Sequence, residues 1–112
     1  MNFNYQSETF GKARRILMLP SPHGEAVAIM LAFHECGLGL HQLNEEGSDA
    51  RTREKIKRLK ELMDTKEIED PEKRGRWIIK AEQFSMSEKR ELSDLVDELA
   101  SLFDRKFYDR AS

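Results

Sequence analysis

All three histidines and the one cysteine of this 112-residue chain lie between residues 23 and 41. Imidazole and thiolate are good ligands for zinc and other transition metals, and three or four of them can complete a tetrahedral site. His34, Cys36 and His41, with His23 as a further donor, are therefore the candidate metal ligands. Their spacing differs from the C-x-x-C and H-x-x-x-H pairs of structural zinc sites. The sequence as a whole requires no cofactor.

The same residues have an interpretation without a metal. If a helix reaches Cys36, the side chains of His34 and Cys36 point about 160° apart. His23 would then lie about 16 Å from His34 along the helix axis, too far for both to hold one ion within a continuous helix. In this interpretation His34 is a hydrogen-bonded core histidine, and Cys36 is a small buried apolar side chain.

A second candidate site is a ligand loop in the segment Pro20-Ser21-Pro22-His23-Gly24-Glu25. If a strand precedes the loop, the free N–H groups at the start of the following helix would favour an anion. His23 and Glu25 could then transfer a proton, with Ser21 beside them. The segment contains neither G-x-G-x-x-G nor G-K-[ST], so no phosphate-binding motif is present. The alternative is ordinary capping of a buried helix.

A third candidate is a run of six cations with only Glu54 opposing them: Arg51, Arg53, Lys55, Lys57, Arg58 and Lys60. Such a run can form a nucleic-acid surface, or it can be the solvated flank of an ordinary helix whose long side chains lie beside an apolar stripe. Glu91, Asp94 and Glu98 share a face of the last predicted helix and could pair with these cations within or between chains.

Composition restricts the class of protein. The 19 Lys and Arg nearly balance 21 Asp and Glu, leaving a net charge of −2, which argues against general affinity for polyanions. A single cysteine excludes an intramolecular disulfide, and the N-terminus lacks a signal-peptide apolar region. The longest apolar run, Ala26 to Phe33, is far shorter than the ~20 residues that span a bilayer. We expect a cytoplasmic protein without a membrane partner.

The length suits one domain, residues 1–112. Residues 1–13 show no clean period and are expected to be a loosely ordered arm or a short docking segment. The run 16–19 suits a buried strand or the end of a short helix. The first clear helix is predicted over Pro22–Cys36, with Ser21 at its start and Gly37 ending it.

The apolar arc of this helix predicts which side is buried. Val27, Met30, Leu31, Phe33 and His34 occupy a wide arc, which we expect to face the core. The opposite, narrow stripe comprises Glu25, Ala28, Ala32 and Glu35.

The second half of the chain shows clearer signals. Residues 44–47 suit a loop, and Ser48 caps a helix that runs to Met63. The charged segment 64–76, with Pro71 and Gly75, is expected to be a linker. Residues 77–81 suit a strand or the lead-in to the last helix.

The last helix carries the strongest pattern. Ser85 and Glu88 form a capping-box signature, and an apolar stripe follows over four turns. Its members are Leu92, Leu95, Val96, Leu99, Leu102, Phe103 and Phe107.

The patterns together predict a mainly α, small three-helix domain, with a minor two-stranded β element from 16–19 and 77–81 left open. The apolar stripe exceeds what such a core needs, and we expect Leu99, Phe103 and Phe107 to bind a protein partner or a second copy. The sequence therefore favours a non-enzymatic interaction or regulatory module that self-associates, with homodimerisation expected. The alternatives are metal or small-ligand binding through residues 23–41, and nucleic-acid binding through the helix at 48–63.

Overall fold

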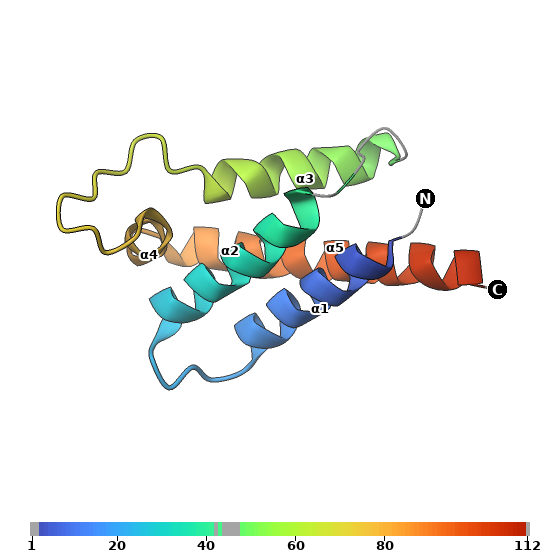
Figure 1. The fold of residues 1–112 in the computed structure, drawn as a ribbon, viewed down its shortest axis with the longest axis horizontal. Helices are drawn as coiled ribbons and strands as arrows, with labels where there is room; N and C mark the ends of the chain where they lie inside the picture. Colours follow the sequence, from blue (N-terminus) through green and yellow to red (C-terminus); the bar gives the residue numbers. More distant parts are fainter. Residues whose placement is uncertain (1–2, 42, 44–47, 112) are drawn as a thin grey trace.

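The computed structural model shows a mainly helical protein (Figure 1). It describes residues 3–41, 43 and 48–111, with the side chains of 106–111 left out of the description. These residues form five helices and no strand: α1 Asn4–Met18, α2 Glu25–His41, α3 Ala50–Met63, α4 Arg76–Glu82 and α5 Met86–Ala111. The expected three-helix count and the two-stranded element are therefore wrong for these residues. The alternative for 16–19, the end of a helix, is confirmed, since α1 ends at Met18, and 77–81 belong to α4. The predicted loop 44–47 lies outside the described residues.

The expected N-terminal arm is instead helix α1. Its buried residues are Gln6, Thr9, Phe10 and Ala13, an i, i+3, i+4, i+7 set. Two of these four are polar, so the helical period of the buried positions cannot be recognised when only apolar residues are counted. Gln6 Nε2 donates to the backbone oxygen of Gly39 at 3.1 Å, so a polar side chain is accommodated in the interface with α2.

Helix α2 does not end at Gly37 but continues through Gly37 and Gly39 to His41. A Cβ at Gly37 would lie 3.3 Å from Cη2 of Trp77, and one at Gly39 would lie 3.1 Å from Cε2 of Phe10. Both glycines therefore permit close packing of neighbouring helices, and neither acts as a cap. Helix α2 also starts later than predicted, at Glu25, after Gly24 with φ +96°.

The predicted buried face of α2 is also corrected. Ala28, Ala32 and Cys36 are buried, whereas Leu31 is 43% exposed and His34 is exposed. Of the predicted arc, only Phe33 is fully buried. The helix is apolar around most of its circumference, so the packing of α1 and α4 against it decides which side is covered.

The C-terminal half agrees more closely with the sequence patterns. Asp49, rather than Ser48, caps α3: its side chain accepts from the backbone N–H of Thr52 at 2.7 Å. The linker at 64–75 is irregular as predicted. The capping box of α5 is confirmed, with Ser85 Oγ accepting from Glu88 N at 3.1 Å and Glu88 Oε1 accepting from Ser85 N at 2.9 Å.

The core lies between the helices, and its largest fully buried side chains come from α1, α2, α3 and α5. Phe103 is fully buried, with its ring 5.9 Å from that of Phe3 and 5.1 Å from that of Phe10. Leu99 is also fully buried. Phe103, which belongs to the apolar stripe of α5, is therefore covered within the chain by α1 and the residue before it, because the segment expected to be a loose arm is a helix.

Candidate functional site

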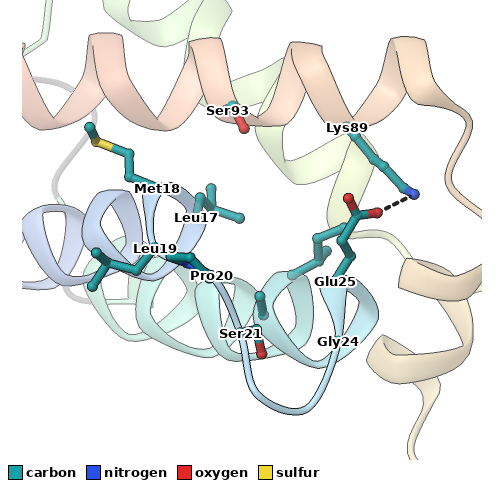
Figure 2. A pocket seen from close by; sticks show the side chains of 11 residues that line it. Leu17, Met18, Leu19, Pro20, Ser21, Gly24, Glu25, Lys89 and Ser93 are labelled. Atoms are coloured by element: carbon teal, nitrogen blue, oxygen red, sulfur yellow. Dashed lines mark hydrogen bonds and ion pairs between the residues drawn. The ribbon is translucent and has the colours of Figure 1, made fainter.

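A cleft with a volume of about 490 Å³ opens where the end of α1, the start of α2 and the first half of α5 meet. Its inner side is apolar, formed by Leu17, Ala28 and Ile29, and the last two are buried. Figure 2 shows Ser93 of α5 directed toward this space. The cleft therefore combines an apolar interior with an open mouth.

Two large apolar side chains stand at the edge of the cleft. Met18 is 70% exposed and Leu19 is 64% exposed, and both line the opening. Helix α1 ends here because Pro20 disfavours the helical conformation of the residue before it. Leu19 accordingly has extended dihedral angles, φ −95° and ψ 146°. The end of α1 thus leaves two apolar side chains in solvent beside an apolar hollow.

A second hollow adjoins the cleft on the other side of Met18. It has a volume of about 330 Å³ and shares Leu17, Met18 and Ser93 with the cleft. We call the two hollows together the α1–α5 groove. Arg14, Asp94 and Asp97 complete its lining.

The charges along the α1–α5 groove are largely paired with one another. Lys89 Nζ lies 2.6 Å from Glu25 Oε2, a pair that Figure 2 shows at one end of the cleft. Arg14 Nε lies 2.8 Å from Asp97 Oδ1. Asp94 is exposed and has no ion pair in the part of the chain that the structure describes. One carboxylate in the groove is therefore available to a cation from outside.

Two of the three candidate residues of the predicted ligand loop line the cleft. Ser21 and Glu25 line it, whereas His23 is exposed and does not. Ser21 Oγ accepts from the backbone N–H of His23 at 3.3 Å, so this bond comes from the main chain and not from the imidazole. Glu25 is held by Lys89. The loop therefore turns the chain from α1 into α2, and the side chains of Ser21 and Glu25 have partners within the chain.

The predicted metal ligands do not converge. His34 and His41 are exposed on α2, whereas Cys36 is fully buried on its other side. Burial raises the pKa of the Cys36 thiol to about 12, so it stays protonated at neutral pH, whereas metal binding needs the thiolate. Among the described residues, no three His, Cys, Asp or Glu side chains are grouped so as to hold an ion. His34 is also not the core histidine of the alternative interpretation.

The basic run on α3 is divided between ion pairs and solvent. Arg58 Nε and Nη2 donate to the two carboxylate oxygens of Glu91 at 2.6 and 2.7 Å. Lys55 forms an ion pair with Glu98. The predicted pairing with the acidic face of the last helix is thus confirmed for these two residues, within the chain. Arg51, Arg53 and Lys57 are exposed, and Lys60 has a partner of its own.

Two of the three predicted partner-binding residues are not on the surface. Leu99 and Phe103 are fully buried in the core, and the side chain of Phe107 lies outside the described residues. The exposed apolar residues at the groove are instead Met18 and Leu19, which the sequence pattern placed in a buried strand or a helix end. Pro20 was the available signal, because it predicts that the residue before it leaves the helix.

None of the helices in the described part of the chain is both long enough and apolar enough to cross a membrane. Comparison with protein-family models, with curated proteins and with solved structures finds no match for the chain. The fold defines a small, mainly helical protein, and its function has to be argued from its own surfaces.

Proposed function

We propose that this chain is a non-enzymatic protein-interaction module that binds a segment of a partner protein in the α1–α5 groove. The observation that carries the proposal is the exposure of Met18 and Leu19, at 70% and 64%, beside an apolar hollow. Fully burying a side chain of this size contributes roughly 1.5–3 kcal/mol. A partner that covers both residues would therefore gain from surface that the chain leaves in water.

The charges of the groove specify the chemistry of the partner. Glu25 and Lys89 neutralise each other, as do Arg14 and Asp97, which leaves Asp94 as the unpaired charge. A partner segment with two or three aliphatic or aromatic side chains and one Lys or Arg would fit the apolar interior and this carboxylate.

Selection from a library of random displayed peptides tests this proposal. We expect enriched sequences to combine apolar residues with a Lys or Arg. A synthetic peptide of the consensus sequence, titrated into isotopically labelled protein, should shift the amide resonances of Leu17, Ala28 and Ser93. No enrichment, or shifts confined to other surfaces, would contradict the proposal.

Matched variants sharpen the test. Leu19→Ser should weaken the selected peptide at least tenfold, which corresponds to ~1.4 kcal/mol. Asp94→Asn should weaken it less, through loss of the charge contact alone. Met86→Ser is the control, since Met86 is 62% exposed and lines neither hollow. Equal affinity of the Leu19 and Met86 variants would show that the peptide binds elsewhere.

The two alternative functions receive less support. A metal site would need His34 and Cys36 to move from opposite sides of α2. Nucleic-acid binding through α3 would have to compete with the carboxylates that already hold Arg58 and Lys55. Affinity for DNA or RNA that falls steeply with salt would favour the latter function.

A further inference from the structure

A further cavity lies between α2, the linker and α4, and it shares no lining residue with the α1–α5 groove. Its volume is about 430 Å³, within the range of small-molecule sites. We call it the α4 pocket, and it is lined by Met30 of α2, Thr65 of the linker and residues 74–78. The pocket is therefore a site whose function can be argued apart from the groove.

The interior of the α4 pocket is apolar and includes the only tryptophan of the chain, Trp77. Met30, Trp77 and Ile78 are half-buried. The Trp77 ring packs edge-on against Phe33 with the centroids 6.1 Å apart, and its Nε1 donates to the backbone oxygen of Met63 at 3.1 Å. The indole is thus held in place with its N–H already bonded. It presents aromatic, apolar surface to the pocket.

The wall formed by the linker is held by its own hydrogen bonds. The Asp70 carboxylate accepts from the backbone N–H groups of Arg74 and Gly75, at 2.7 and 2.8 Å. Gly75 has φ +106°, a conformation that side-chain-bearing residues rarely adopt. This wall is therefore formed before a ligand arrives, which lowers the entropy lost on binding.

The charges of the α4 pocket favour an anion. Two arginines and no carboxylate lie among the described residues that line it. Arg74 Nη2 donates to Glu82 Oε2 at 2.7 Å, so this guanidinium is already paired. Arg76 is exposed and forms no ion pair within the described part of the chain. Its planar guanidinium can donate two parallel hydrogen bonds to one carboxylate.

We propose that the α4 pocket binds a small aromatic carboxylate, with the ring against Trp77 and the carboxylate on Arg76. The ring would remove apolar surface from water and add an aromatic contact. A small anion without a ring would gain only an exposed ion pair, which contributes little. The ligand therefore needs both parts, and the proposal does not depend on the groove of the proposed function.

Fluorescence of Trp77 tests this proposal, because every tryptophan signal of the protein comes from the pocket. Hydrocinnamate, a phenyl ring on a short chain that ends in a carboxylate, is the probe. We expect a saturable change with a dissociation constant on the order of 0.1–1 mM, as for a ligand of this size. Acetate should give no change over the same range. Absence of a saturable change with hydrocinnamate, or an equal change with acetate, would overturn the proposal.

Matched variants test the role of Arg76. Arg76→Gln should weaken hydrocinnamate about threefold to fivefold, the effect of losing an exposed ion pair, and should leave the affinity of its neutral amide unchanged. Arg53→Gln removes the same charge from an exposed position on α3 outside the pocket and should bind as the wild type does. Equal weakening by both variants would contradict a direct contact with Arg76.

Two further measurements fix the place and the source of the ligand. Hydrocinnamate should shift the amide resonances of Thr65 and Ile78 in isotopically labelled protein, and Leu19→Ser, in the groove, should leave its affinity unchanged. Shifts confined to the groove would overturn the site. An acetylated tripeptide that ends in phenylalanine offers the same ring and carboxylate. Binding of this peptide at least tenfold tighter than hydrocinnamate would identify a protein C-terminus as the ligand and overturn the small-molecule proposal.

Discussion

At the scale of single residues, Gly39 determines how closely α1 approaches α2. A Cβ at this position would clash with Thr9 Oγ1 and lie 3.1 Å from a ring carbon of Phe10. Gly11, in the middle of α1, has nothing within 4 Å of the same added atom. The two glycines are therefore a matched pair: one is required by packing, and the other only weakens its helix.

We expect Gly39→Ala to destabilise the protein by about 1–3 kcal/mol through overpacking. Gly11→Ala should instead stabilise it by roughly 0.5–1 kcal/mol, because alanine loses less conformational entropy in a helix. Urea denaturation, monitored by circular dichroism, measures both. Stabilisation by Gly39→Ala would contradict the close contact of α1 and α2.

At the scale of elements, α1 is the helix whose packing makes Phe103 of α5 a core residue. The aromatic contacts of Phe3 and Phe10 with Phe103, and the hydrogen bond from Ser7 Oγ to Asp104 Oδ1, join α1 and the residue before it to α5. Arg14 and Asp97 continue this contact, so the two helices run antiparallel. Phe103 is therefore a structural residue.

Phe103→Ala should lower the free energy of unfolding by about 3–5 kcal/mol, as expected for a large aromatic side chain removed from a core. Met86→Ala, which truncates a side chain that is 62% exposed, should change it by less than about 0.5 kcal/mol. Denaturation midpoints of the two variants provide the comparison. If Phe103→Ala kept wild-type stability and changed only the mass in solution, Phe103 would be a partner-binding residue after all.

At the scale of the whole molecule, carboxylates that are hydrogen-bonded only in the folded state link stability to pH. A hydrogen bond from Arg58 holds the pKa of Glu91 below its usual range, and the backbone N–H of Ser85 does the same for Glu88. Folding therefore lowers both pKa values relative to the unfolded chain. Their contribution to stability is fully present above the unfolded pKa of about 4.3 and is lost as the pH falls through the folded values.

We therefore expect the free energy of unfolding to be constant near neutral pH and to decrease once the pH falls below about 4.3. Glu91→Gln should reduce the slope of this decrease, because it removes one of the linked protons. Glu54→Gln, at an exposed position on α3, should keep the wild-type slope. Urea titrations at a series of pH values test this, and identical slopes for all three proteins would exclude a role for the Arg58–Glu91 pair.

The sequence by itself determined the features that depend on neighbouring residues. It predicted the helical class, the helix ending at Met63, the irregular linker and the capping box of Ser85 and Glu88. It also indicated that the carboxylates on one face of the last helix could pair with the basic run, and the structure shows such pairs for Arg58 and Lys55. Such features depend on residues within a few helical turns of one another, or on the regular spacing of residues along a helix.

Only the tertiary structure decided which surfaces are covered. Helix α2 is apolar around most of its circumference, so its period could not show that the small residues Ala28, Ala32 and Gly39 face inward. Helix α1 was not predicted, because the polar residues Gln6 and Thr9 occupy two of its buried positions. Without α1, the sequence could not show that Phe103 is covered. The α1–α5 groove stays open once the described helices have packed, and that outcome depends on contacts between residues far apart in the chain.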